Sequence, residues 1–309
     1  LMPIRPADHG IFASSAAGGA AGQGYFGGGG VAGGYLSVVD RFLFADDSRT
    51  ILGTGLSAAR YLLAAMASSV AGYFGGGKSI TATVDRFLFS NDSRTSLGTG
   101  LSAARYSLSA MASSVAGYFC GGNEPPTYGI TTVDRFLFSD DSRTTLGTGT
   151  STGSYSGAAM ASSVAGYVIL GGTPAGWSST VDRFLFSNDS RTTLASGLSD
   201  TRAGGAAMAS SVAGYYGGGR DTVDTVDRWL FSNDSRTTLG TGLSTQRVWL
   251  AAMASTAAGY FGGGDNDSGA TREVTTVDRF LFADDSRTTL GTGLSNVSKE
   301  LAGMANLGA

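Results

Sequence analysis

A short stretch in which apolar and polar residues alternate returns six times along the chain. Its first copy is residues 39–44, Val-Asp-Arg-Phe-Leu-Phe, and the later copies are marked by their acidic residue: Asp85, Asp134, Asp182, Asp227 and Asp278. Alternation with a period of two, in a segment rich in Val and Phe, predicts a β-strand. No segment of the chain shows a sustained helical period of 3.6 residues.

Three more short segments of each repeat have strand-like composition. In the second repeat they are residues 64–69, 72–77 and 94–100, and the connections between paired segments hold the Ser, Asn and Asp typical of hairpin turns. The Asp of the alternating stretch always precedes the next Met by 26 residues, and that Met precedes a Tyr by 7. Only the step from this Tyr to the next Asp varies, from 12 to 18 residues. All length variation is therefore confined to one loop, between the second and third strands.

Four strands in a period of 45 to 51 residues predict propeller blades. The chain begins with a second strand (residues 24–30) and ends with a first strand (residues 301–306), so joining the ends completes one blade. We predict an all-β fold: a six-bladed β-propeller with four antiparallel strands per blade, closed by N-terminal strands that pair with the C-terminal strand. Residues 24–309 form this single domain, and residues 1–23 are an N-terminal arm outside the repeats that either packs loosely or docks on a neighbour. We expect the Arg of each alternating stretch, such as Arg41, to bond acceptors between blades.

The second strand of most repeats ends in a Gly-Gly doublet, such as Gly76-Gly77, and the repeats cover residues 24–309. In these features the chain resembles the kelch repeat family. It departs from the kelch pattern in having Phe in place of the usual third-strand Tyr, and in lacking the fourth-strand Trp. The resemblance implies a six-bladed propeller. It also implies an Arg near the link between blades, which some kelch-like proteins use to bind acidic ligands.

Composition and charge exclude several classes of function. The net charge is −3 and no basic stripe is present, so we expect no nucleic-acid partner. No run of 18 apolar residues occurs, so we expect no membrane insertion. No signal peptide is visible. A single cysteine, Cys120, permits no disulfide within the chain and leaves the compartment open.

Residues able to carry out catalysis are scarce. His9, in the arm, is the only histidine, so neither a Ser-His-Asp set nor a His/Cys zinc site fits within the ring. Glu124 and Glu273 are loop carboxylates without an evident catalytic partner. We therefore expect no enzyme activity, no catalytic or metal-binding residues, and no cofactor.

Two short motifs have simpler structural explanations. The acidic turns at Asp46, Asp140 and Asp284 lack the alternating ligands and distal Glu of a calcium loop, so we interpret them as turns in which Asp bonds its own backbone. Five glycosylation sequons occur, three of them within the repeat turns: Asn91, Asn188, Asn233, Asn266 and Asn296. Because turns explain most of them, glycosylation stays undecided.

Function is expected where the repeats differ. The variable loops share a face with the links between blades, and that face collects aromatic residues and four Arg that lie six residues before a Met. The candidate partner-binding residues are Arg60, Arg105, Arg202, Arg247, Tyr61, Tyr106, Tyr128, Trp177 and Trp249. The alternative is that the Arg cap carbonyl groups at the channel mouth and the aromatics pack down the loops. Aromatic platforms and Arg forks are suited to glycans or to a protein partner.

Three functional hypotheses follow. The first is a non-enzymatic structural or assembly protein: a rigid propeller subunit of a surface, an extracellular filament or a virion appendage, whose partners are further copies or another structural protein. The second is a carbohydrate- or protein-binding module, lectin-like or adhesin-like, that uses the variable-loop face. The third is an intracellular kelch adaptor. The first two place the protein outside the cell, at the cell surface or on a virion.

Overall fold

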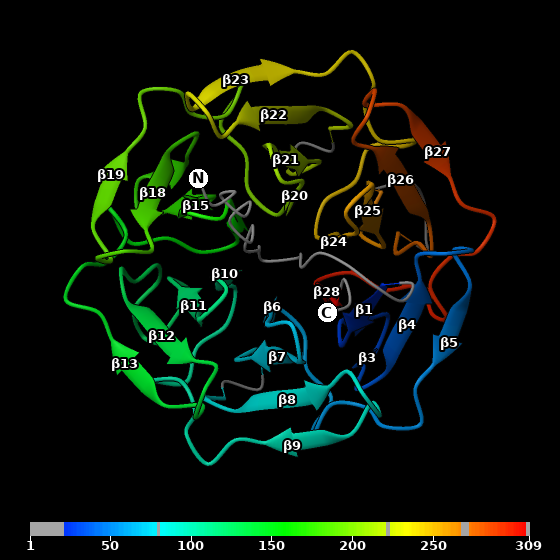
Figure 1. Cartoon of the computed structure of the whole chain (residues 1–309), viewed down its shortest axis with the longest axis horizontal. Coiled ribbons are helices and arrows are strands. Elements are labelled where there is room, and N and C mark those ends of the chain that lie inside the picture. The colour runs from blue at the N-terminus through cyan, green and yellow to red at the C-terminus, as the bar shows by residue number, and fades with distance from the viewer. Residues whose placement is uncertain (1–21, 79–80, 221–222, 267–271, 307–309) are drawn as a thin grey trace, which may run out of the picture.

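The structure is a computed structural model that describes residues 22–78, 81–220, 223–266 and 272–306. Its elements are all β-strands, and they form six four-stranded sheets arranged around a central axis (Figure 1). We number the sheets as blades one to six in chain order. The predicted all-β, six-bladed propeller is confirmed. Within the described ranges, no helix is long and apolar enough to cross a membrane.

Each blade contributes one strand to each of four concentric positions. The inner strands are β28 (Ala302–Asn306), β6 (Ala64–Ala67), β10 (Ser109–Ala112), β14 (Ala158–Ala161), β20 (Ala206–Ala209) and β24 (Ala251–Ala254). The second strands are β1 (Gln23–Gly27), β7 (Ala71–Gly75), β11 (Ala116–Cys120), β15 (Ala165–Ile169), β21 (Ala213–Gly217) and β25 (Ala258–Gly262). The third strands are β4 (Val39–Leu43), β8 (Val84–Leu88), β12 (Val133–Leu137), β18 (Val181–Leu185), β22 (Val226–Leu230) and β26 (Val277–Leu281). The outer strands are β5 (Arg49–Ile51), β9 (Arg94–Ser96), β13 (Arg143–Thr145), β19 (Arg191–Thr193), β23 (Ser235–Thr238) and β27 (Arg287–Thr289).

Blade one joins the two ends of the chain. β28 pairs antiparallel with β1, with Met304 opposite Tyr25, and the sheet order is β28-β1-β4-β5. Figure 1 shows β28, in red, beside the blue strands of the N-terminal region. The predicted closure is therefore confirmed. Gln23, the last residue of the predicted arm, is the first residue of β1. Gly22 is also described, and residues 1–21 of the predicted arm lie outside the described residues.

Within the described residues, the strands beyond these four per blade all lie in the variable loops between second and third strands. β2 (Gly30–Val31) pairs with β3 (Gly34–Tyr35) in blade one, and β16 (Gly172–Thr173) pairs with β17 (Gly176–Trp177) in blade four. Because neighbouring strands are antiparallel, these loops lie on the same face as the links between blades. We call this face the loop face and the opposite one, which carries the hairpin turns, the turn face.

The inner strands pack against one another through small residues and one Met each. A Cβ added to Gly117, in β11, would lie 2.2 Å from Sδ of Met66 in the preceding blade, so only Gly leaves room for the sulfur. The same contact occurs at all six blade interfaces, between Met253 and Gly24, Met304 and Gly72, Met66 and Gly117, Met111 and Gly166, Met160 and Gly214, and Met208 and Gly259. This repeated packing explains why the spacing between Asp, Met and Tyr does not vary.

A polar clamp also joins each blade to the next. The Tyr of the second strand and the Arg of the third strand both bind one Asp, which lies in the outer turn of the following blade with φ between 55° and 57°. Tyr Oη lies 2.7 to 3.0 Å from this carboxylate and Arg 2.5 to 3.8 Å from it. The six clamps are Tyr25 and Arg41 on Asp92, Tyr73 and Arg86 on Asp141, Tyr118 and Arg135 on Asp189, Tyr167 and Arg183 on Asp234, Tyr215 and Arg228 on Asp285, and Tyr260 and Arg279 on Asp47. The predicted role of Arg41 and its equivalents is confirmed.

The acidic turns on the turn face are stabilised by local hydrogen bonds. The backbone N–H of Ser48 donates to Oδ1 of Asp46 at 3.0 Å, and Asp140, Asp284 and the Asn of the sequon turns accept equivalent bonds. The interpretation of these segments as turns is confirmed. Among the described residues, no group of His, Cys, Asp and Glu could hold a metal ion.

The presence of Cys120 in place of Gly is explained by a smaller side chain in the next blade. In four blades this position is Gly, because a neighbouring aromatic ring fills the space; a Cβ at Gly75 would lie 2.4 Å from the ring of Phe119. Blade four has the smaller Val168 in place of that Phe, and Cys120 packs in the same core cluster as Val168. Burial raises the pKa of the Cys120 thiol to about 12, so it stays protonated as part of the core.

Candidate functional site

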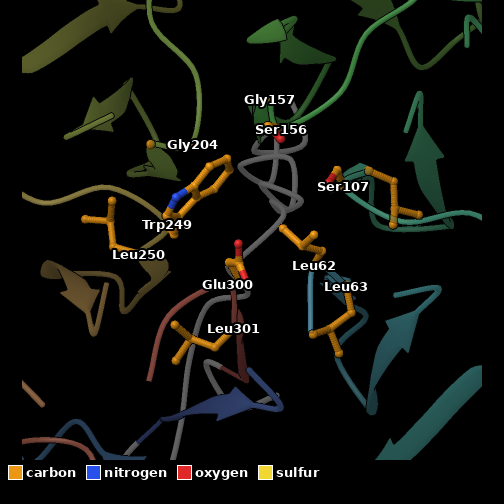
Figure 2. Close-up of a pocket in the computed structure, with 12 residues that line it drawn as sticks. Leu62, Leu63, Ser107, Ser156, Gly157, Gly204, Trp249, Leu250, Glu300 and Leu301 are labelled. Atoms are coloured by element: carbon orange, nitrogen blue, oxygen red, sulfur yellow. The ribbon is translucent and has the colours of Figure 1, made fainter. Parts of the chain in front are cut away.

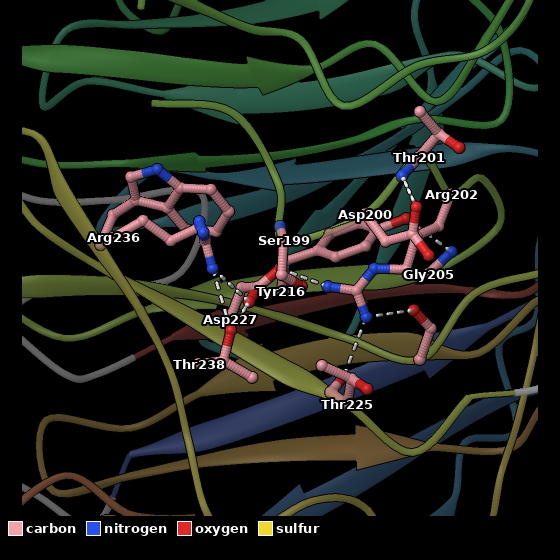
Figure 3. Close-up of polar contacts among 12 residues, drawn as sticks. Ser199, Asp200, Thr201, Arg202, Gly205, Tyr216, Thr225, Asp227, Arg236 and Thr238 are labelled. Carbon is pink, nitrogen blue, oxygen red and sulfur yellow. Dashed lines mark hydrogen bonds and ion pairs between the residues drawn. The ribbon is translucent and has the colours of Figure 1, made fainter. Parts of the chain in front are cut away.

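The four predicted Arg of the links between blades are buried. Arg60, Arg105, Arg202 and Arg247 are at most 3% exposed, and each forms an ion pair with the third-strand Asp of its own blade. Figure 3 shows the arrangement in blade five: Arg202 binds Asp227 and donates to the carbonyl oxygen of Thr225 at 3.2 Å. The other oxygen of Asp227 accepts a hydrogen bond from Thr238 at 2.7 Å.

Blades one and four lack this Arg. In blade one, Ser298 takes its place, and Ile51 replaces the hydroxyl residue that would donate to the second carboxylate oxygen. Among the described residues, Oδ1 of Asp40 consequently has no hydrogen-bond partner, although Arg49 lies 3.6 Å away. A cavity of about 10 Å³ lies beside Asp40 and Ser298, where the guanidinium lies in the other blades. The Arg–Asp pair is thus an optional structural element of a blade.

These contacts agree with the structural interpretation of the four Arg, in which they cap carbonyl groups. Each guanidinium is covered by its own blade, so a ligand on the loop face would meet other residues first. Their role in binding a partner stays a prediction.

On the loop face, six residues form a ring around the axis. Each blade contributes one of them, the residue four positions before its inner-strand Met. Each has a left-handed backbone, with φ from 51° to 72°. Each N–H donates to the carbonyl oxygen of its counterpart in the preceding blade at 2.6 to 2.8 Å, so the hydrogen bonds form a closed circle. The members of this axial ring are Leu62, Ser107, Ser156, Gly204, Trp249 and Glu300.

The axial ring surrounds a pocket of about 70 Å³ at the mouth of the central channel (Figure 2). The backbone of the axial ring has approximate sixfold symmetry. Its side chains break that symmetry, because apart from the two Ser they all differ. Trp249 and Glu300, from adjacent blades, both project toward the mouth in Figure 2. Burial raises the pKa of Glu300, while Lys299 opposes this shift. The mouth therefore combines an indole, a carboxyl group and two hydroxyl groups on one rigid backbone.

Next to this pocket, the structure brings Trp177 and Trp249 together through a residue that the sequence analysis did not single out. The guanidinium carbon of Arg220 lies 5.0 Å from the ring centroid of Trp177 and 5.7 Å from that of Trp249. Tyr155 makes an edge contact with Trp177, with centroids 6.3 Å apart. Arg220 follows the Gly-Gly doublet of blade five. At the position of Arg220 the other blades have Gly, Lys, Asn or Asp. That variation at a fixed position was the signal that could have identified it.

The remaining predicted aromatics lie apart from this group. Tyr61 stacks on Tyr35 with centroids 4.5 Å apart, and burial together with Tyr35 raises the pKa of Tyr61 to about 12. Tyr106 is buried and lies under the ammonium group of Lys78, 5.0 Å from its ring centroid. Tyr128 is 66% exposed on the loop of blade three. The nine candidates therefore do not form one site. Trp177 and Trp249 meet at Arg220, whereas Tyr61 and Tyr106 both adjoin Lys78.

Comparison with known proteins supports the fold. No family model matches the chain, and no curated protein matches it. Among 542 matching chains in solved structures is that of YjhT, with a TM-score of 0.66 and 14% sequence identity. That match covers 82% of this chain and 91% of YjhT. Identity this low shows shared architecture and carries no function across. The chain is therefore a six-bladed β-propeller similar in fold to YjhT.

Proposed function

We propose that the chain is a non-enzymatic, kelch-like propeller that acts as a rigid structural or assembly subunit. The repeated charged and aromatic groups support this proposal because the ring itself uses them: Tyr, Arg and Asp form the clamps, and the buried Arg fasten the links. A place in a surface layer, an extracellular filament or a virion appendage belongs to the proposal, as does a location outside the cell.

The observation that carries the proposal is an arc of four exposed valines on the turn face. Val70, Val115, Val164 and Val212 occupy the same turn in four successive blades and are 55% to 65% exposed. Blade six has Ala257 at this position. Because these turns join the inner and second strands, the valines lie near the axis, along four of the six blades. An exposed apolar arc of this kind is typical of a protein contact surface, and a second copy offers the same spacing.

Replacement of the four valines by Thr is expected to weaken self-association at least tenfold. The change keeps the shape of each side chain and adds a hydroxyl group that must lose its water in the contact. Sedimentation velocity over a concentration series measures the association constant. Ile51→Thr, an equally exposed residue on outer strand β5, is the matched control and should leave association unchanged. A parent chain that stays monomeric, or a quadruple variant that assembles like the parent, contradicts the assembly role.

A second candidate is a binding module that uses the loop face, favoured by the cluster of Trp177, Trp249 and Tyr155 beside the axial pocket. For this function we expect the parent chain to bind members of a glycan array, and the double variant Trp177→Ala/Trp249→Ala to lose that binding. An unchanged melting temperature of the variant would show that the fold is intact. Array binding that survives both substitutions would place the ligand elsewhere.

A further inference from the structure

The guanidinium of Arg220 is held between two indole rings. Its guanidinium carbon lies over both rings, 5.0 Å from the centroid of Trp177 and 5.7 Å from that of Trp249, and the ring faces attract the cation. A stacked guanidinium keeps its in-plane N–H groups available. Arg220 is exposed, and within the described part of the chain its side chain forms no ion pair or hydrogen bond. The edge that normally binds a carboxylate thus faces solvent.

The cation and both of its aromatic neighbours lie on backbone that is fixed by hydrogen bonds. Trp177 pairs with Gly172 in the hairpin of β16 and β17. The N–H of Arg220 donates to the carbonyl oxygen of Ala203 at 2.7 Å, and the N–H of Trp249 donates to that of Gly204 at 2.6 Å within the axial ring. The cation and its platform therefore come from adjacent positions of one rigid frame. Little conformational freedom is left to lose when a ligand binds, which favours affinity.

The adjoining axial pocket, which Trp249 lines but Arg220 and Trp177 do not, limits the size of a group that can enter it. A cavity of about 150 Å³ holds a benzene molecule, whereas the axial pocket has about 70 Å³. The pocket is too small to enclose a sugar ring, but the end of an acidic side chain fits inside it. Glu300, the carboxyl group of the mouth, belongs to blade one, and Trp249 of blade six stands between it and Arg220 of blade five.

We propose that Trp177, Arg220 and Trp249 form a receptor for an Asp or Glu side chain of a protein partner. Arg220 binds the carboxylate through two parallel N–H groups, and the indoles cover the aliphatic part of that side chain. Trp and Arg are the residues that most often dominate the energy of protein contacts. The inference rests on the binding role proposed for the loop face and names the chemistry of its partner.

The test uses N-acetyl-glutamate amide as the probe and N-acetyl-glutamine amide as its neutral match. The indole N–H signals of the three Trp are followed by NMR while each probe is added to the ¹⁵N-labelled chain. Trp229 is fully buried in the core and serves as an internal reference. We expect the signals of Trp177 and Trp249 to shift with the glutamate probe alone, and the Trp229 signal to stay in place.

Arg220→Gln should weaken this binding at least tenfold, because the variant loses both the charge and the paired N–H groups. Lys78→Gln is the matched control: it removes another stacked cation of the loop face and should not change the affinity. Equal shifts with both probes, or full binding by Arg220→Gln, would overturn the proposal. So would galacturonate binding ten times more tightly than the glutamate probe, since the site would then be built for an acidic sugar.

The failure of this inference can be separated from failure of the binding role. If array binding is lost in the Trp177→Ala/Trp249→Ala chain but retained by Arg220→Gln, the loop face binds ligands and the carboxylate receptor is wrong. If neither the array nor the glutamate probe binds the parent chain, both are wrong.

Discussion

A chain that lacks residues 299–309 is expected to lose the cooperative thermal transition of the parent. These residues contain β28, the only inner strand of blade one. Leu301 and Met304 are buried, and truncation of such residues costs about 2 to 5 kcal/mol each. The deletion also opens the axial ring at Glu300 and leaves β1 with an unpaired edge. The combined loss is of the order of the total stability of a domain. Circular dichroism during heating measures the effect.

A synthetic peptide of residues 299–309 provides the matched control. Added in excess, it should pair with β1 and move the transition of the shortened chain back toward that of the parent. If the shortened chain melts like the parent without the peptide, the closing strand is not needed and the account of blade one is wrong.

Arg105→Met is expected to lower the free energy of unfolding by about 3 to 5 kcal/mol at neutral pH. The guanidinium of Arg105 and the carboxylate of Asp134 are 3.0 Å apart and fully buried, so the substitution leaves a buried charge without its counter-ion. Chemical denaturation measures the change. Arg143→Met is the matched control, because Arg143 approaches the other oxygen of Asp134 at 3.5 Å but is 28% exposed. It should cost less than about 1 kcal/mol. Equal effects of the two variants would contradict the importance of burial.

The pH dependence gives a second measure of the same pair. Burial alone would raise the pKa of Asp134, but Arg105 and the hydroxyl of Thr145 hold it below its ordinary value. A lowered pKa in the folded state stabilises the protein above the ordinary carboxyl pKa of about 4, and this stabilisation is lost as the pH falls through the folded-state value. Without Arg105 the pKa of Asp134 rises. The difference in stability between parent and Arg105→Met should therefore shrink as the pH falls from the raised pKa of Asp134 in the variant to its lowered pKa in the parent.

The fold could be predicted from the sequence because its repeated contacts leave repeated residues. The constant spacing from Asp to Met reflects a Met that must reach the Gly of the next blade, and the Arg of each third strand recurs because each blade needs a clamp. The missing first strand at one end and the missing second strand at the other indicated the closure.

The candidate site was predicted less well, for physical reasons. The four link Arg look like surface residues in a polar segment, and only the three-dimensional path of the link shows that they turn inward onto a third-strand Asp. The axial ring has no sequence signature, because a left-handed backbone held by hydrogen bonds accepts side chains as different as Leu62, Trp249 and Glu300. Arg220 of blade five joins Trp177 of blade four and Trp249 of blade six, which lie 43 and 29 residues away from it in the sequence.

The clamp of Tyr, Arg and Asp has a consequence for the topology of the chain. The same three groups meet at all six interfaces between blades, including the one between blades six and one, where Tyr260 binds Asp47. In these contacts no interface differs from the others. Blade one is the seam only because the covalent chain is interrupted there. A circular permutant that begins in the turn between the inner and second strands of another blade would contain the same set of clamps, and its two ends would meet in that blade.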